Sequence, residues 1–244
     1  MNKEKIKAEV QHLNKSFGNN MVLDDMCIKI SEGENLVVLG KSGSGKSVLI
    51  KCLVGLIEPD EGEIILLGEN IYGLENEKLN ALRKKVGFLF QSAALYDSKS
   101  VRENLAFHLR DLKTKSIEDI DELVIEALKN VGLEEAIDKM PSELSGGMRK
   151  RVGLARTLML KPEIILYDEP TTGLDPITSR EISRLILDVQ KKYNTASIII
   201  THDMECARIT ANRMIIIKDG KTYIEGTYKE LSESKDEWVS SFFN

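Results

Sequence analysis

The stretch GKSGSGKS, residues 40–47, decides the fold that this 244-residue chain is expected to adopt. It fits the pattern G-x-x-x-x-G-K-[ST], in which glycines let backbone N–H groups curl round phosphates at a helix N-terminus. An apolar run over 36–39 precedes it and predicts a buried strand, and a helix is expected over 47–56. A plain Gly/Ser-rich turn is a poor alternative, because the fixed positions would match by chance about once in a hundred such chains.

This loop supplies the groups that nucleotide phosphates need. Lys46 would contact the β- and γ-phosphates, and the Ser47 hydroxyl would ligate Mg²⁺. The residues predicted to bind the nucleotide here are Gly40, Ser42, Gly43, Ser44, Gly45, Lys46 and Ser47.

The chain around this loop alternates between strand and helix patterns. Alternating apolar residues over 6–10 predict a half-buried strand, and a turn signal at 18–20 separates it from a second strand over 26–30. The segment 98–160 has little strand signal. Further strands are predicted over 64–67, 86–90, 164–167, 197–200 and 214–217, and helices over 120–128, 148–160 and 177–191. We therefore expect one α/β domain with a helical subdomain inserted at about 91–160.

Composition excludes several classes of protein. Hydrophobic residues are 42% and charged residues 30%, which excludes a mostly disordered chain. The net charge of -5 argues against broad nonspecific binding to nucleic acid. Cys27, Cys52 and Cys206 show no CxxC spacing, so we expect free thiols in a reducing cytoplasm rather than a zinc site. The apolar runs fall far short of the ~20 residues that span a bilayer, so any membrane connection is expected to go through a partner.

Two acids, Asp168 and Glu169, end the apolar strand expected over 164–167. Acids in such a place are costly to bury unless something pairs with them, and consecutive side chains on a strand diverge. One carboxylate can therefore face a metal while its neighbour faces a water. Asp168 is the candidate metal ligand and Glu169 the candidate general base. The alternative is a pair of solvated acids opening a turn before Pro170.

A second anion-binding pattern lies at the start of the helix expected from 148. Ser145 is a good N-cap residue, and Gly146 and Gly147 leave the first N–H groups open to an anion. The alternative is a capped helix start with nothing bound. The basic run at 149–151 is expected to form a face of the same helix.

The chain resembles the ATP-binding subunit of an ABC transporter, with the family's motifs in order over nearly its whole length. Residues 40–47 are similar to the Walker A motif, and residues 164–169 to Walker B with the catalytic glutamate. Residues 144–148 are similar to the signature LSGGQ, with Met148 in place of Gln. The other matches are Gln91 for the Q-loop, residues 172–175 for the D-loop, His202 for the switch histidine and Phe17 for the aromatic that stacks on adenine.

The resemblance implies an α/β fold built on a P-loop NTPase core, with an N-terminal antiparallel β subdomain and an inserted α-helical subdomain. Residues 1–244 would form a single ABC ATP-binding domain. Within it, 1–90 and 161–231 would form the RecA-like core and the β subdomain, 91–160 the helical signature subdomain, and 232–244 a C-terminal tail.

The same resemblance implies roles for individual residues. The catalytic set would be Glu169, His202, Lys46 and Gln91, and the Mg²⁺ ligands Ser47, Gln91 and Asp168. Phe17, Ser145, Gly146, Gly147 and Asp175 would join the phosphate loop in binding ATP, with the signature element closing over the ATP of a second protomer. Without the resemblance, His202 would be a core or capping residue, Gln91 an ordinary polar residue and Phe17 a core aromatic.

The implied assembly is a homodimer that drives a separate integral-membrane permease, docked near residues 91–110 on the cytoplasmic face of a bacterial inner membrane. An Mce-domain lipid-binding protein and a small regulatory subunit are further implied partners, and nucleic acid is not. A nucleotide kinase would leave residues 144–148 and 201–203 unexplained. A DNA-repair or translation ATPase would need a coiled coil or second ATP domain, and a non-catalytic regulator would be expected to lose Glu169 or His202.

A few short sequence segments indicate the cargo. The segments FQSAALY (90–96), NLAF (104–107) and DPIT (175–178), with Met148-Arg149, are similar to the Mce/Mla-type lipid-trafficking branch. The resemblance therefore implies phospholipid movement between the inner membrane and the outer envelope. An amino-acid or other small-solute importer, and a lipoprotein-release or cell-division complex, are the alternatives.

Overall fold

The central sheet of the computed structural model contains six strands within the described residues, 5–110 and 116–243. Strand order is β10-β9-β3-β8-β7-β6, and every neighbouring pair is parallel except the antiparallel pair of β9 and β10. The strands are β3 (Asn35–Gly40), β6 (Val86–Leu89), β7 (Ile164–Asp168), β8 (Ala196–Ile200), β9 (Arg213–Lys218) and β10 (Lys221–Gly226). Because parallel strands end at the same edge of a sheet, the residues that follow β3, β7 and β8 come together there.

A second, antiparallel sheet lies beside the first, with strand order β2-β1-β4-β5. Its strands are β1 (Ile6–Phe17), β2 (Asn20–Ser31), β4 (Glu61–Leu66) and β5 (Glu69–Asn70). β1 extends well past the predicted residues 6–10, because a bulge interrupts its alternation. His12 has a left-handed backbone (φ 50), and the buried residues on either side are Val10 and Leu13, three positions apart instead of two.

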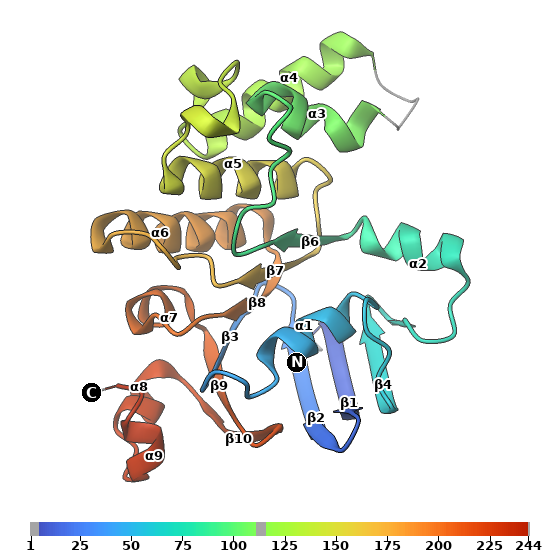
Figure 1. Ribbon diagram of the computed structural model, residues 1–244, viewed down its shortest axis with the longest axis vertical. Helices are drawn as coiled ribbons and strands as arrows, with labels where there is room; N and C mark the ends of the chain where they lie inside the picture. The colour runs from blue at the N-terminus through green and yellow to red at the C-terminus, as the bar shows by residue number, and fades with distance from the viewer. Residues whose placement is uncertain (1–4, 111–115, 244) are drawn as a thin grey trace.

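Figure 1 shows where the helices lie around the two sheets. α1 follows β3 directly, α6 and α7 pack beside the central sheet, and α3, α4 and α5 form a separate layer beyond α6. Their bounds are α1 (Lys46–Leu53), α2 (Asn76–Arg83), α3 (Val101–Arg110), α4 (Ile117–Asn130), α5 (Gly146–Leu158), α6 (Pro176–Tyr193), α7 (Met204–Thr210), α8 (Tyr228–Ser232) and α9 (Glu237–Ser240). Short 3₁₀ turns occupy Glu134–Ala136 and Pro141–Glu143. Throughout residues 5–110 and 116–243, no helix has both the length and the apolar character needed to cross a membrane.

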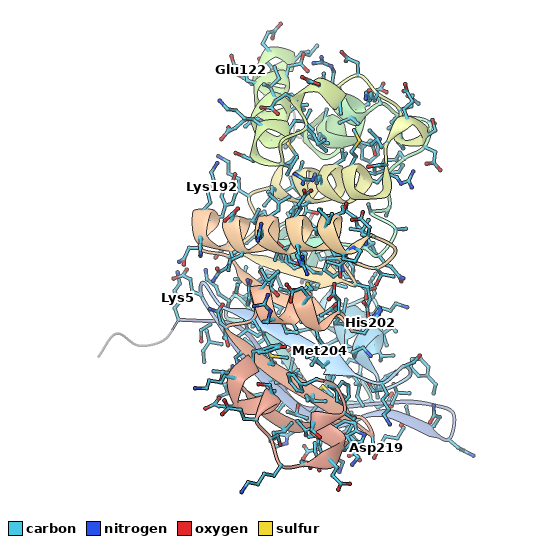
Figure 2. All side chains as sticks on the ribbon, turned by 90° about the vertical axis from the view of Figure 1, so that its left-hand side faces the viewer. Lys5, Glu122, Lys192, His202, Met204 and Asp219 are labelled. Atoms are coloured by element: carbon cyan, nitrogen blue, oxygen red, sulfur yellow. The ribbon has the colours of Figure 1, made fainter. Side chains whose placement is uncertain are left out.

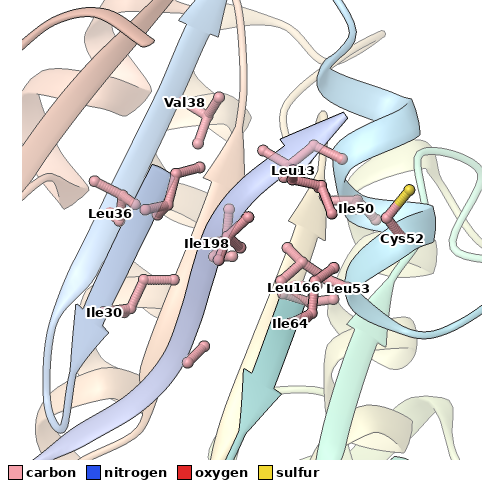
Figure 3. Close-up of a cluster of buried hydrophobic side chains, with 14 of the residues drawn as sticks. Leu13, Ile30, Leu36, Val38, Ile50, Cys52, Leu53, Ile64, Leu166 and Ile198 are labelled. Atoms are coloured by element: carbon pink, nitrogen blue, oxygen red, sulfur yellow. The ribbon is translucent and has the colours of Figure 1, made fainter. Parts of the chain in front are cut away.

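Apolar burial joins these layers and fixes the loop after β3. Leu36 and Val38 of β3 face α1 and the antiparallel sheet, in the cluster that Figure 3 draws with Leu13, Ile64 and Leu53. The alternate residues of β3, Val37 and Leu39, face the opposite side, where α6 packs with Ile182 and Ile186. A third cluster forms within α3, α4 and α5. Both faces of β3 are therefore buried, as its continuous apolar run predicts.

The expected α/β class, with an antiparallel β unit and a helical insert, is confirmed. The segment 91–160 contains α3, α4 and α5. At the C-terminal end, the ring centroid of Trp238 lies 5.1 Å from that of Tyr223 on β10 and 5.0 Å from that of Phe242. The tail helix α9 therefore packs on its own domain, and Val239 within it is fully buried.

Candidate nucleotide-binding site

A cavity of about 600 Å³ opens at the sheet edge where β3, β7 and β8 end. Most of the predicted site residues line it, although they come from segments far apart in the sequence. The lining consists of Val22, Gly40, Ser42, Gly43, Ser44, Gly45, Lys46, Ser47, Val48, Gln91, Asp168, Glu169, Ile200 and His202. His202 lies at one side of the molecule, between the helical layer that carries Glu122 and the opposite end near Asp219 (Figure 2).

The loop before α1 is shaped to receive an anion. Gly45 has φ 100, and a Cβ there would lie 2.6 Å from the carbonyl oxygen of Val22, so a glycine is required. Because this glycine is also the N-cap residue of α1, the first-turn amides have no side-chain cap from it. Within the described part of the chain, the buried Oγ of Ser44 has no hydrogen-bond partner. Free amides and an unsatisfied hydroxyl at a helix N-terminus fit a bound phosphate.

Lys46 places a cation at the centre of this loop. Its Nζ donates to the carbonyl oxygens of Gly40 (2.7 Å) and Lys41 (3.0 Å). Burial lowers the pKa of Lys46, while the nearby carboxylates of Glu169 and Asp168 act in the opposite direction. A half-buried ammonium close to these acids and to the loop amides is placed to meet the charge of a triphosphate.

Asp168 ends β7 inside the cavity. Burial raises the pKa of its carboxyl, and the charge of Glu169 adds to the rise, whereas Lys150, Lys51 and Lys46 lower it. A partly buried carboxylate of this kind gains from a cation partner. Asp168, Gln91 and Ser47 offer oxygen ligands on one cavity, the donor type that Mg²⁺ prefers, so the residues present fit that ion.

Glu169 is held firmly from both its backbone and its side chain. Its backbone is left-handed (φ 50), which costs about 1–2 kcal/mol for a residue with a Cβ. Its N–H donates to the carbonyl oxygen of Ile200 at 2.9 Å. Its Oε2 accepts from Thr172 Oγ1 at 3.0 Å and lies 2.7 Å from His202 Nδ1. Glu169 and His202, two of the four residues predicted to be catalytic, are therefore in direct contact.

Phe17 ends β1 outside this lining set. Half of its surface is exposed, and Lys15 Nζ lies 5.5 Å from its ring centroid. Such exposure excludes the interpretation of Phe17 as a core aromatic and leaves part of its ring at the surface.

Ser145, Gly146, Gly147 and Asp175 form a second group that does not contribute to the lining of this cavity. Ser145 caps α5 by accepting from the N–H of Met148 at 3.3 Å, and Asp175 caps α6 by accepting from the N–H groups of Ile177 and Thr178 at 3.0 Å. A Cβ on Gly147 would lie 2.5 Å from Thr178 Cγ2, so the two helix starts are packed together. One chain thus carries a phosphate loop and, apart from it, a pair of capped helix N-termini.

Lys150 contacts two of the residues that line this cavity, and the sequence interpretation missed it. The basic run 149–151 was expected to be a helix face, but only Arg149 is exposed, and Lys150 is buried with 5% of its surface accessible. Its Nζ donates to the carbonyl oxygens of Gln91 (2.6 Å) and Glu169 (3.0 Å). The sequence does carry a signal for the burial of Lys150, which is its helical spacing from apolar and small residues. One buried face of α5 contains Gly147, Lys150, Leu154 and Leu158.

His12, Asp25 and Cys27 also come together, although their spacing gave no sign of it. Their ligand atoms lie within 4.8 Å of one another, on the exposed surface of the antiparallel sheet. His12 Nδ1 lies 2.7 Å from Asp25 Oδ1, and the N–H of His12 donates to Cys27 Sγ at 3.3 Å. The bulge at His12 and the left-handed backbone of Asp25 (φ 51) produce this pairing, which is a local feature of the sheet.

A phosphate loop on a parallel sheet, two acids at the end of β7 and a histidine after β8 define a P-loop ATPase. The capped, glycine-rich start of α5 narrows the class to ATP-binding cassettes. Residues 23–172 match the family described as "ABC transporter", and the chain belongs to this family. It is accordingly an ATP-hydrolysing, ATP-binding subunit of an ABC transporter.

Curated relatives span nearly the whole chain. The probable ribonucleotide transport ATP-binding protein mkl of Mycobacterium tuberculosis is 40% identical over 98% of this chain and 67% of its own length. The intermembrane phospholipid transport system ATP-binding protein MlaF of Haemophilus influenzae is 38% identical over 96% of this chain and 89% of its own. The methionine import ATP-binding protein MetN of Clostridium tetani is 39% identical over 91% and 70%.

Solved structures confirm the fold. CbiO1 from Clostridium perfringens, described as part of the ABC transporter complex cbiONQ, superposes with a TM-score of 0.86 at 31% identity, over 96% of this chain and 93% of that one. A dimeric ATP-binding cassette in a post-hydrolysis state with ADP and Pi bound gives a TM-score of 0.82 at 31% identity, over 91% and 99%.

Proposed function

We propose that this chain powers a bacterial ABC transporter that moves phospholipid between the inner membrane and the outer envelope. The observation that carries the proposal concerns residues 90–96. Their sequence is similar to that of the lipid-trafficking branch, and they form one surface of the protein. A permease helix would dock there, so this surface reports on the permease, and hence on the cargo, better than the ATP-binding residues do.

This docking surface is built to be rigid. The buried side chain of Asn104 accepts from the N–H of Tyr96 at 2.8 Å and donates to the carbonyl oxygens of Tyr96, Lys99 and Ser100. The guanidinium of Arg156 donates to the carbonyl oxygens of Ala93 and Ala94, which both have left-handed backbones. Because these hydrogen bonds hold the segment in place, it can transmit a displacement to a partner.

The same surface carries exposed aromatic side chains. Phe90 and Tyr96 are each 40% exposed, Phe90 stacks on Phe88 with ring centroids 4.0 Å apart, and Tyr96 lies 4.7 Å from Phe107. Aromatic side chains held by stacking are typical anchors for a partner helix. We assign the permease contact to the range 91–110 together with Phe90.

The printed names of the three relatives point to three cargo classes, ribonucleotide, phospholipid and methionine, and the last two match the classes expected from the sequence. The printed name of MlaF favours phospholipid. The similarity to MetN favours a methionine-type or other small-solute importer as the second candidate. The sequence identities to MlaF and MetN, 38% and 39%, do not separate the two classes. We favour phospholipid because the sequence of residues 90–96 is similar to the lipid-trafficking branch.

The catalytic unit in this proposal is a head-to-tail pair of copies. Ser145, Gly146, Gly147 and Asp175 stand apart from the cavity of their own chain, so they are free to close over the nucleotide of the other copy. The dimeric post-hydrolysis structure with ADP and Pi supports this arrangement. ATP then joins the copies and hydrolysis releases them, and this cycle drives the permease.

Within each site, the phosphate loop and Lys46 bind the phosphates, and Phe17 stacks on the adenine. Glu169 accepts a proton from the attacking water, and His202, in contact with Glu169 Oε2, orients that water and the γ-phosphate. Ser47, Gln91 and Asp168 would hold Mg²⁺, which when bound neutralises charge on the phosphates.

The partners follow from this assignment. We place the chain on the cytoplasmic face of the inner membrane, held there by its permease, with an Mce-domain lipid-binding protein and a small regulatory subunit as further components. Nucleic acid has no place in the assembly.

The test is to solubilise the membrane gently, isolate the complex through this chain, and identify the membrane protein and lipid that accompany it. The complex is then reconstituted in phospholipid vesicles, and ATP-dependent lipid transfer is compared for the wild type, Glu169→Gln and the exposed control Glu126→Gln on α4. Transfer that Glu169→Gln abolishes and Glu126→Gln retains supports the proposal. A permease that co-purifies with a soluble amino-acid-binding protein would refute it.

A further inference from the structure

Lys150 joins three parts of the site through one ammonium group. It lies on α5, the helix whose N-terminus is capped by Ser145. Its Nζ donates to the carbonyl oxygen of Gln91 at 2.6 Å and to that of Glu169 at 3.0 Å. The start of α5, the Gln91 segment and the candidate general base are thereby tied together by side-chain to backbone hydrogen bonds.

A lysine is an unusual choice for this buried position. Lysine side chains are seldom fully buried, and an apolar residue of similar length would pack here without desolvating a charge. Burial lowers the pKa of Lys150 to about 8, while Asp168 and Glu169 act to raise it. The two carbonyl oxygens supply the hydrogen bonds that compensate for desolvation, so the contact is specific to a donor group.

The hydrogen bond to Glu169 falls where the backbone is strained. Glu169 is left-handed, and its N–H is already engaged by Ile200. The bond from Lys150 fixes the carbonyl on the other side of the same residue. Two opposed anchors thus set the direction of the Glu169 side chain toward His202 and Thr172.

Helix α5 makes this contact sensitive to movement. Ser145 and Lys150 are five residues apart, about 7.5 Å along a rigid helix, so they move as one body. A rotation of α5 that brings Ser145 toward a neighbouring copy must also move the donor that holds Gln91 and Glu169.

We propose that Lys150 is a positioning residue that couples the placement of Ser145, Gly146 and Gly147 to the alignment of Gln91 and Glu169. This inference rests on the proposed two-copy ATP site. Lys150 does not touch the nucleotide in this scheme. It sets the carboxylate of Glu169 for hydrolysis when α5 is in its closed position.

The test compares Lys150→Met, which keeps the length but removes the donor, with Lys150→Gln, which keeps a shorter donor. The matched control is Arg151→Met, because Arg151 is a cation on the same helix that donates to the carbonyl oxygen of Val131 and to Glu181, away from the cavity. Steady-state hydrolysis of ATP with Mg²⁺ and the melting temperature are measured for each full-length variant.

We expect Lys150→Met to lower kcat at least about tenfold with KM for ATP within about twofold, and Lys150→Gln to recover part of the loss. Arg151→Met should lower the melting temperature and leave kcat within about twofold. The inference is wrong if kcat of both Lys150 variants stays within about twofold of wild type. It is also wrong if kcat falls no further in the Lys150 variants than in Arg151→Met at an equal loss of melting temperature. Glu169→Gln separates the two ideas, since an active Glu169→Gln overturns the site itself, whereas an inactive one beside active Lys150 variants overturns only the coupling.

Discussion

Replacement of Glu169 by Gln should remove turnover and keep ATP binding. In the wild-type protein, Thr172 Oγ1 donates to Glu169 Oε2 at 3.0 Å. Glutamine has the same size and keeps an oxygen that can accept this hydrogen bond, so the left-handed turn at residue 169 should remain. What disappears is the carboxylate that we propose accepts the proton of water. A general base contributes about 10²–10⁴-fold, equivalent to about 3–5 kcal/mol of transition-state stabilisation. We therefore expect kcat to fall at least about 100-fold.

The assay is phosphate release at saturating ATP and Mg²⁺, with the molecular mass measured by light scattering under the same conditions. Glu169→Gln should accumulate as a dimer in ATP, and Glu126→Gln should behave as wild type. Turnover within about threefold of wild type would refute the assignment of Glu169 as the base. Loss of ATP binding together with turnover would show that the carboxylate serves the fold of the site instead.

Three further changes test other parts of the structure. Gly45→Ala should weaken ATP binding at least about tenfold, measured with a fluorescent analogue, because its Cβ would strike the backbone at a φ that alanine avoids; normal binding would contradict the loop geometry. Leu53→Ala should lower the free energy of unfolding by about 2–5 kcal/mol in urea titration, whereas the exposed Leu56→Ala should cost far less; equal losses would contradict the packing. The Lys7 hydrogen bond lowers the pKa of Glu163 from 4.5, so it stabilises the fold above pH 4.5 and is lost as the pH falls through the lowered value. The acid-induced fall in melting temperature should therefore be shallower in Lys7→Met, and an unchanged slope would contradict the pairing.

The sequence predicts the residues of the candidate phosphate loop most sharply, for a chemical reason. Few residue types can curl round a phosphate or present an acid at the end of a buried strand, so residues 40–47 and Asp168 are restricted in kind and spacing. The cavity brings these together with Gln91, Glu169 and His202 as the motif order led us to expect. The individual roles of these residues stay predictions.

Other features depended on tertiary contacts that local patterns do not contain. The left-handed residue His12 shifts the alternation of β1 by one position, so the strand continues to Phe17 although its period-two signal stops at Val10. Lys150 belongs to a basic run that was expected to form a helix face, and the packing of α5 against Gln91 and Glu169 buries it. The run of charges does not show which of its three residues points inward, whereas the helical period does.

In the proposed dimer each ATP site is shared between two copies, and mixing two inactive variants provides a direct test of this sharing. Lys46→Met should disable the phosphate loop, and Ser145→Arg should block the surface that closes over the neighbouring nucleotide, so each variant alone should hydrolyse no ATP. In an equal mixture, about half of the dimers are mixed, and each of these has one intact site, which sets a ceiling of about a quarter of wild-type activity. Recovery of phosphate release toward that ceiling is the result we predict. A mixture that never exceeds the sum of its two components, or a Ser145→Arg variant that hydrolyses ATP normally by itself, would contradict the shared site.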